Sequence, residues 1–264
     1  MTSQAISTDG TIIAFDRIGA GAPVVLVHGT TGYRAISPKM TALAERLSQK
    51  FTVLHYDRRG RGASGDTAPY AVAREIEDLA ALLATTGPAA LVGFSSGGVL
   101  AAEAAAAGLP ITRLVLYEPA IILENPPRPL PPDYVETLDR LLAAGDRDGA
   151  SQYFLMTVMG IPKPEIEKVR TGGTWHILTG IAHTLPYDGR IITSAFPSFA
   201  VPVRWEAITQ PTLIVDGSES SAKNHPSADA IAAIIPHASR ETLAGQHHDV
   251  SIDAIAPAIE HFLA

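Results

Sequence analysis

Short apolar runs alternate along the chain with longer segments of helical spacing. Odd and even positions of these runs are both apolar and often β-branched, which predicts strands buried on both faces in a parallel sheet. Helices must then cover both faces of that sheet, so the alternation predicts an α/β fold. The predicted buried strands are residues 23–27, 51–56, 89–94, 111–117 and 211–215, and residues 239–243 are predicted as a further strand. The predicted helices are residues 37–49, 70–85, 97–107, 227–235 and 252–262.

The first residues depart from this alternation. Residues 4–7 and 11–17 predict a β-hairpin turned at Asp9-Gly10, a strong local turn signal. We therefore expect a mixed sheet with an antiparallel edge.

A second departure follows Glu118. No buried-strand pattern recurs until about residue 208, and helical patterns appear at 133–144 and 146–159. The chain is therefore predicted to form one core with a helical cap inserted into it. The expected division is a core of residues 1–118 and 208–264 and a cap of residues 119–207.

Composition narrows the class of partner. The 264 residues are 46% hydrophobic and 18% charged, which predicts a globular chain with a sizeable core. The net charge of −7 argues against nucleic acid or an anionic membrane and favours a small neutral molecule. The sequence has no cysteine, which excludes disulfides and thiolate metal sites. Without an apolar run of membrane-spanning length or a signal-like start, we expect a soluble, cytoplasmic protein; its oligomeric state stays open.

One motif carries the strongest chemical signal. Gly93-Phe94-Ser95-Ser96-Gly97 directly follows a predicted strand and directly precedes a predicted helix. A G-x-S-x-G elbow needs this context, because the serine occupies a strained turn where only glycine fits beside the crowded backbone. Ser95 is therefore the candidate nucleophile; the alternative is a glycine-rich turn with an idle serine.

A nucleophile needs a base and donors for the charge that builds on the attacked oxygen. The turn after residue 27 can bring the backbone N–H of Thr30 to the same oxygen as that of Ser96, while His28 itself is interpreted as structural. Near the C-terminus, His247 and His248 fall in a loop that can reach the strand ends. We prefer His248 as the base because it lies where the loop enters the last helix.

Other patterns are weaker. Residues 60–65 spell G-x-G-x-x-G, but no helix opens at the third glycine, so dinucleotide binding is not expected. Arg58, Arg59 and Arg61 are interpreted as a solvated or salt-bridged turn. No histidine spacing suggests zinc, so we expect neither a metal nor a cofactor.

With these motifs in place, the sequence resembles the α/β-hydrolase superfamily over essentially its whole length. The matching features, in the family's chain order, are the turn at His28-Gly29, the loop at residues 57–62, the elbow at residues 93–98 and the loop at His248. The resemblance implies an eight-stranded, mostly parallel sheet flanked by helices, with a helical cap between the sixth and seventh strands.

One position departs from the family pattern. The acid of the triad is usually an aspartate shortly after the seventh strand, but Ser220 holds that place here, and a serine cannot carry the charge that orients the imidazolium. Glu118 ends the predicted sixth strand, where some members place their acid. Among these are the zearalenone-type lactone hydrolases, to which the elbow and Glu118 are similar. We expect Glu118 to orient His248, with Asp216 and Glu219 as rivals.

These residues together predict a cofactor-independent serine hydrolase that cleaves a small, largely apolar carboxylic ester or lactone through an acyl-enzyme. Thr31, Met156 and Trp175 are the expected substrate-binding residues. The alternatives are a metal-free perhydrolase or C–C bond hydrolase on the same fold, and a receptor-like binding module with little turnover.

Overall fold

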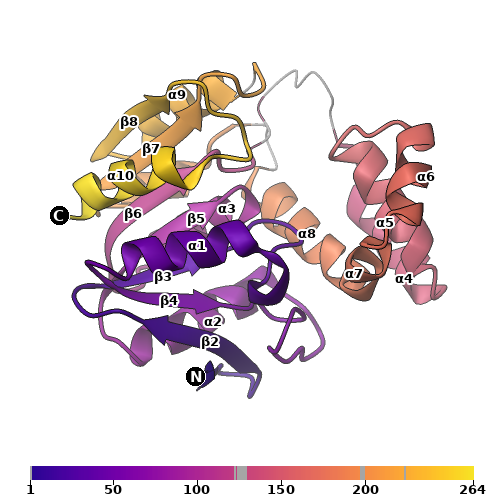
Figure 1. Cartoon of the computed structure of the whole chain (residues 1–264), viewed down its shortest axis with the longest axis horizontal. Helices are drawn as coiled ribbons and strands as arrows, with labels where there is room; N and C mark the ends of the chain where they lie inside the picture. The colour runs from indigo at the N-terminus through magenta and orange to yellow at the C-terminus, as the bar shows by residue number, and fades with distance from the viewer. Residues whose placement is uncertain (1, 122, 124–129, 197–199, 223) are drawn as a thin grey trace.

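An eight-stranded sheet forms the centre of the computed structural model (Figure 1). The structure describes residues 2–121, 123, 130–196, 200–222 and 224–264. The strands lie in the order β1-β2-β4-β3-β5-β6-β7-β8. Their bounds are β1 Thr2–Ile6, β2 Ile12–Ile18, β3 Pro23–Val27, β4 Thr52–Tyr56, β5 Ala89–Phe94, β6 Ile111–Tyr117, β7 Thr212–Gly217 and β8 Ala238–Leu243.

The pairing confirms the predicted mixed sheet. β1 pairs antiparallel with β2 and β2 antiparallel with β4, whereas every pair from β4 to β8 is parallel. The hairpin turns at Asp9-Gly10, and Gly10 has a φ of 83°, in the left-handed region that glycine adopts without strain. Because the parallel strands point the same way, the loops after β3, β5, β6, β7 and β8 meet at one edge.

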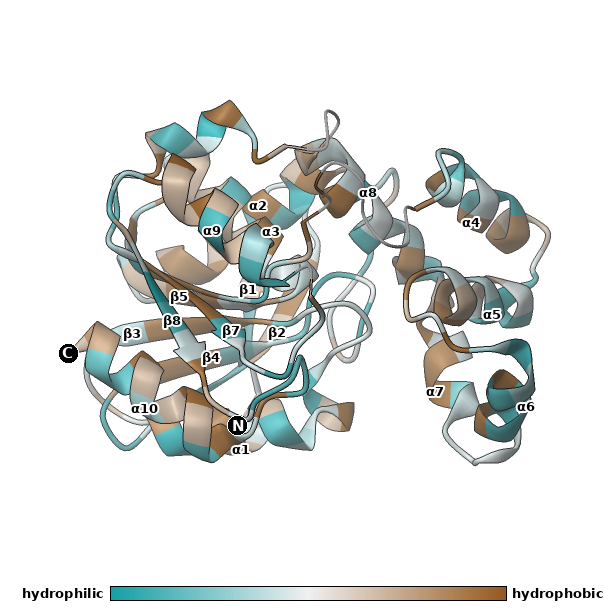
Figure 2. Ribbon diagram, turned by 90° about the horizontal axis from the view of Figure 1, so that it is seen from above, coloured by the Kyte–Doolittle hydropathy of each residue, from teal (hydrophilic) through white to brown (hydrophobic). Residues whose placement is uncertain are grey.

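Two layers of helices cover the sheet, and their bounds are α1 Pro38–Leu47, α2 Val72–Ala84, α3 Ser96–Ala106, α9 Asn224–Ile234 and α10 Ile252–Leu263. Figure 2 shows α1 and α10 on one side of the sheet and α2, α3 and α9 on the other. Each side buries its own apolar cluster against the strands, as a doubly covered parallel sheet requires. Among the described helices, none combines the length and apolarity needed to cross a membrane.

Among the described residues, five further α-helices lie between β6 and β7 in the chain, where a cap was predicted. They are α4 Tyr134–Ala143, α5 Arg147–Thr157, α6 Lys163–Thr171, α7 Trp175–Gly180 and α8 Leu185–Ala195. Figure 1 shows α4 to α7 grouped to one side of the sheet, with α8 between them and the core. Parts of the predicted cap, residues 122, 124–129 and 197–199, lie outside the described residues.

The apolar residues of this insertion divide between two cores. Leu138, Phe154 and Ile166 pack in a separate cluster of α4, α5 and α6. Ile191 and Trp205 instead pack into the main core, on the side of the sheet that α2, α3 and α9 cover. The Trp205 side chain is fully buried there. The second half of α8 therefore ties the insertion to the core.

Candidate active site

The elbow places Ser95 between β5 and α3. Ser95 has a φ of 53° and a ψ of −122°, a strained conformation that the short turn from strand to helix imposes. A Cβ on Gly97 would overlap the carbonyl oxygen of His28. Glycine at that position therefore allows the first turn of α3 to lie against the end of β3.

This approach brings two backbone donors together beside Ser95. The hydroxyls of Thr30 and Ser96 lie 3.1 Å apart, so the loop after β3 contacts the start of α3. In the part of the chain that the structure describes, neither the Thr30 nor the Ser96 backbone N–H donates to a protein acceptor. Both groups are thus available to an oxygen that gains negative charge, and the N-terminus of α3 adds its positive dipole end.

Glu118 and His248 form a hydrogen-bonded pair across the sheet edge. Glu118 directly follows β6, and its Oε2 lies 2.7 Å from Nδ1 of His248. The Glu118 side chain is 1% exposed and that of His248 is 57% exposed. Gly217 N donates to Glu118 Oε1 at 3.0 Å, and Asn224 Nδ2 donates to Oε2 at 2.5 Å.

These donors keep the Glu118 carboxylate ionised despite its burial. Burial by itself raises the pKa of Glu118, but the hydrogen bonds from His248 and from the Gly217 backbone outweigh it and hold the pKa below its ordinary value. An ionised carboxylate accepts from Nδ1, which leaves Nε2 of the neutral ring free to accept a proton.

Contacts at the ends of β6 and β7 hold the loop that carries His248. The Tyr117 hydroxyl donates to the carbonyl of His247 at 2.5 Å, and His247 Nδ1 donates to the carbonyl of Glu219 at 3.0 Å. A Cβ on Gly217 would overlap the carbonyl of Gln246, so glycine allows the loop to lie directly on the strand end. His247 thus helps to hold the loop in place, and the neighbouring His248 hydrogen-bonds to Glu118.

The rival acids have other surroundings. Asp216 is buried and accepts from Arg240 at 2.8 Å and from Thr242 at 2.7 Å. Glu219 is exposed, and its backbone carbonyl accepts from His247. Among the described residues, no direct hydrogen bond joins Ser95 Oγ to His248, a contact that unliganded hydrolases often complete only with substrate.

Sequence reasoning missed two residues of this neighbourhood. Asn224 begins α9 three residues before the predicted helix start, and Asp188 lies on α8, which was not predicted. Asp188 accepts from the Ser96 hydroxyl at 2.6 Å. Neither carries a local sequence signal, because both reach the site only through tertiary packing.

The arginine turn after β4 differs from a solvated loop. Arg58, Arg59 and Arg61 are all buried, with exposures of 1%, 1% and 2%. Arg58 pairs with Glu75 and Asp188, each at 2.7 Å, and Arg61 also pairs with Asp188. The salt-bridged alternative is confirmed, and the solvated one is wrong.

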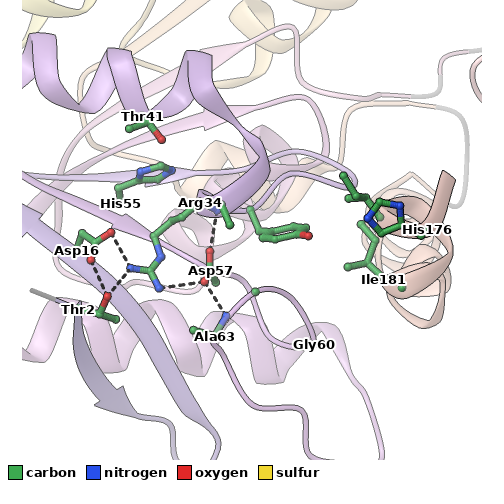
Figure 3. Close-up of a pocket in the computed structure, with 15 residues that line it drawn as sticks. Thr2, Asp16, Arg34, Thr41, His55, Asp57, Gly60, Ala63, His176 and Ile181 are labelled. Atoms are coloured by element: carbon green, nitrogen blue, oxygen red, sulfur yellow. Dashed lines mark hydrogen bonds and ion pairs between the residues drawn. The ribbon is translucent and has the colours of Figure 1, made fainter. Parts of the chain in front are cut away.

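Two cavities lie near the sheet edge. The larger, of about 870 Å³, is drawn in Figure 3 and has mixed walls that include the polar residues Arg34, Asp57 and His55, with His176 of α7 on its far side. Arg34 pairs with Asp16 at 2.8 Å and with Asp57 at 3.0 Å, so one guanidinium lies between two carboxylates. The smaller, of about 170 Å³, is lined by His28, Gly29, Lys39, Met40, Leu43, Phe94, His248, Asp249, Val250, Ile252 and Ile255.

The expected substrate-binding residues are spread over two regions. Thr31 lies beside the candidate oxyanion donor, has a φ of 65° and donates its hydroxyl to the carbonyl of Thr30 at 2.6 Å. Trp175 donates to Asp148 at 2.6 Å within the insertion, and Met156 is 45% exposed there. Substrate binding by these three residues stays a prediction.

His28 forms a buried pair with His55, as a structural role requires. The two Nε2 atoms lie 2.7 Å apart, so one ring donates and the other accepts. Burial, aided by the charge on His55 and Arg61, lowers the pKa of His28 well below its ordinary value. Burial also lowers the pKa of His55 to about 4. Both rings are therefore neutral in the folded protein at pH 7.

This pair predicts acid sensitivity. An unfolded histidine gains a proton near pH 6.5 while these folded ones resist it, so the stabilisation is present above that pH and is lost below it. When the pH falls from 7 to 5, we expect His28 and His55 each to lower the free energy of unfolding by about 2 kcal/mol. Urea denaturation at both pH values measures this. His55→Gln should show a smaller pH effect, and equal pH effects in the variant and the parent protein would contradict the interpretation.

Comparison with known proteins agrees with this geometry. Residues 24–258 match the model of the alpha/beta hydrolase family. A pimeloyl-[acyl-carrier protein] methyl ester esterase of Stenotrophomonas maltophilia is 28% identical over 259 residues, with 94% of this chain and 95% of that protein covered. A solved alpha/beta hydrolase from Sphaerobacter thermophilus is 46% identical, has a TM-score of 0.88, and is covered over 100% of its length by 99% of this chain.

A further solved structure shares the fold alone. The enol-lactonase from Burkholderia xenovorans has a TM-score of 0.68 at 21% identity, with 99% of each chain covered. The sheet order, the serine elbow and the matched family model define one class of protein. This chain belongs to the alpha/beta hydrolase family.

Proposed function

We propose that the protein is a serine hydrolase that cleaves a carboxylic ester or lactone through an acyl-enzyme, without a cofactor. The hydrogen bond of 2.7 Å between Glu118 and His248, at the sheet edge where the Ser95 elbow emerges, carries the proposal. In this assignment Ser95 is the nucleophile, His248 the general base and Glu118 the acid that orients it. The backbone N–H groups of Thr30 and Ser96 bind the oxyanion.

The reaction proceeds in two halves. His248 Nε2 takes the proton of Ser95 as Oγ attacks the carbonyl carbon, and the carbonyl oxygen becomes an oxyanion held by the two N–H groups. The protonated His248 then gives its proton to the departing alkoxide, which leaves an acyl-Ser95. Water attacks this ester with His248 again as base, and the carboxylic acid and free Ser95 result.

The relative from Stenotrophomonas maltophilia described above, which this chain matches over 94% of its length, is by its name an ester hydrolase. That protein acts on a methyl ester by its name. The shared family and the length of the match support an ester as the substrate class here, and the exposed His248 ring leaves room for a substrate beside it.

The small cavity supports a short, apolar acyl group. It lies beside His248 and Gly29, with walls from α1 and α10 such as Met40, Leu43 and Ile255. A volume of about 170 Å³ holds roughly five or six groups of the size of a water molecule, each taking about 30 Å³. The larger cavity, whose walls include the charged side chains of Arg34, Asp16 and Asp57, suits an apolar chain less well.

This cavity sets the expected chain-length preference. Across p-nitrophenyl esters from acetate to dodecanoate, kcat/KM should peak near four to six acyl carbons, because longer chains exceed the roughly five or six groups that fit. Met40→Ala should shift the peak to longer chains. Met159→Ala, which shortens an exposed methionine of the insertion, is the matched control. A peak that Met159→Ala moves and Met40→Ala does not would place the acyl site elsewhere.

A panel of these esters with aliphatic and aromatic lactones tests the proposed function itself. Turnover that depends on Ser95 supports it and reveals whether esters or lactones are preferred. Tight binding of panel members without turnover would favour the binding module. Halogenation that depends on hydrogen peroxide, without ester cleavage, would favour the perhydrolase.

A further inference from the structure

A buried ion cluster contacts the chain beside both candidate oxyanion donors, at the Gly29 carbonyl and the Ser96 hydroxyl. It contains Arg58 and Arg61 from the loop after β4, Glu75 from α2 and Asp188 from α8. Each of the four residues is no more than 2% exposed. Two positive and two negative charges balance, so the burial leaves no uncompensated charge.

The cluster contacts the loop that carries Thr30. Arg61 Nη1 donates to the carbonyl of Gly29 at 3.0 Å, and Arg58 Nη1 donates to the carbonyl of His28 at 3.3 Å. The Gly29 carbonyl and the Thr30 N–H belong to one planar peptide unit. A guanidinium that holds the carbonyl therefore also sets the direction of the N–H, and it polarises the amide so that the N–H donates more strongly.

The same cluster also contacts the side chain of Ser96, the residue that carries the second donor. Asp188 Oδ1 accepts from the Ser96 hydroxyl at 2.6 Å and from Arg58 at 2.7 Å. Its other oxygen accepts from Arg61. Burial raises the pKa of Asp188, but Arg58 and Arg61 outweigh it and lower the pKa below its ordinary value, so the carboxylate stays an acceptor for Ser96.

We propose that Arg61 and Asp188 are positioning residues that fix and polarise the oxyanion hole, Arg61 through the Gly29–Thr30 peptide and Asp188 through the Ser96 hydroxyl. The inference rests on the proposed function. Asp188 lies on α8 of the insertion. Through Asp188, α8 therefore contributes to the reaction without touching the substrate. Precise placement of such donors matters because they must meet the oxygen of the transition state and not that of the substrate.

The test uses Arg61→Gln and Ser96→Ala, with Arg59→Gln as the matched control. Arg59 is a buried arginine of the same loop, paired with Asp78 at 2.7 Å and Asp9 at 3.0 Å, both outside the oxyanion loop. The readouts are kcat and KM on the best ester of the panel, the thermal midpoint, and Ki for a trifluoromethyl ketone, whose adduct with Ser95 carries an oxyanion.

Arg61→Gln and Ser96→Ala should each lower kcat about tenfold and raise Ki by a similar factor with little change in KM, a smaller effect than outright loss of an oxyanion donor. Arg59→Gln should lower the thermal midpoint while kcat and Ki stay close to those of the parent. If Arg61→Gln loses stability but keeps its Ki, as the control does, the inference is overturned. Should Arg61→Gln not fold, an unchanged Ki in Ser96→Ala overturns it.

The two levels of proposal fail differently. If the parent protein cleaves no ester, or cleaves esters equally well without Ser95, the proposed function is wrong. If hydrolysis depends on Ser95 and Arg61→Gln still behaves as Arg59→Gln does, only the positioning role is lost.

Discussion

Replacing Ser95 by alanine is expected to lower kcat for any ester by about 10⁴-fold or more, because the acyl-enzyme then has no oxygen on which to form. The fold should be unchanged, since alanine adopts the elbow with no larger side chain. Ester turnover and the thermal midpoint of Ser95→Ala, measured beside Ser239→Ala on the edge strand β8, separate lost chemistry from lost structure.

Covalent labelling provides an independent test of Ser95 as the nucleophile. Phenylmethylsulfonyl fluoride should add one group to the parent protein, and peptide mass spectrometry should find it on the elbow peptide that contains Ser95. Ser95→Ala should take up none. A label on another peptide, or activity in Ser95→Ala above a few per cent, would refute Ser95 as nucleophile.

Glu118→Gln has the second-largest expected effect, a loss of about 10²- to 10⁴-fold in kcat. An amide cannot balance the charge of the imidazolium, and its NH₂ end can force the wrong tautomer on His248. Gly217 N donates to Oε1 and Asn224 Nδ2 to Oε2, and the single carbonyl oxygen of glutamine can keep only one of these contacts. With the Gly217 contact kept, the side chain stays in place and the fold should survive. The measurements are kcat, KM and the thermal midpoint.

The rival acids supply the controls for this variant. Glu219→Gln changes an exposed side chain and should leave kcat within about twofold, as surface substitutions usually do. Asp216→Asn weakens a buried contact with Arg240 and should cost stability more than activity. If Asp216→Asn lost as much kcat as is expected of Glu118→Gln, the acid after β7 would be the orienting group.

The two halves of the fold differed in how far sequence could predict them. The six strands from β3 to β8 and the five covering helices lie within a few residues of their predicted bounds, because apolar runs and helical periodicity are strong local signals. In the insertion only α4 and α5 were predicted. The helices α6 and α7 are short, of 9 and 6 residues, and α8 packs partly into the main core, so their local periodicity is weak.

The buried arginines show a second limit. From sequence, Arg58, Arg59 and Arg61 were interpreted as a solvated or salt-bridged turn, and their burial was not predicted because long charged residues are seldom buried. Their burial depends on Glu75 and Asp78 from α2 and on Asp188 from the insertion, which only the folded chain brings to them. No window of neighbouring residues contains this information.

The sequence by itself determined the elements whose conformation depends on adjacent residues: the strands, the hairpin turn and the serine elbow, where glycines and a strand-to-helix junction impose the backbone. Only the tertiary structure decided which distant groups meet. Glu118 and His248 are 130 positions apart and pair because β6 and the loop after β8 end at the same edge of the sheet. Asn224 joins them through α9, and Asp188 reaches Ser96 through α8. Such contacts follow from strand order and helix packing, which place side chains in space without leaving a periodic trace along the chain.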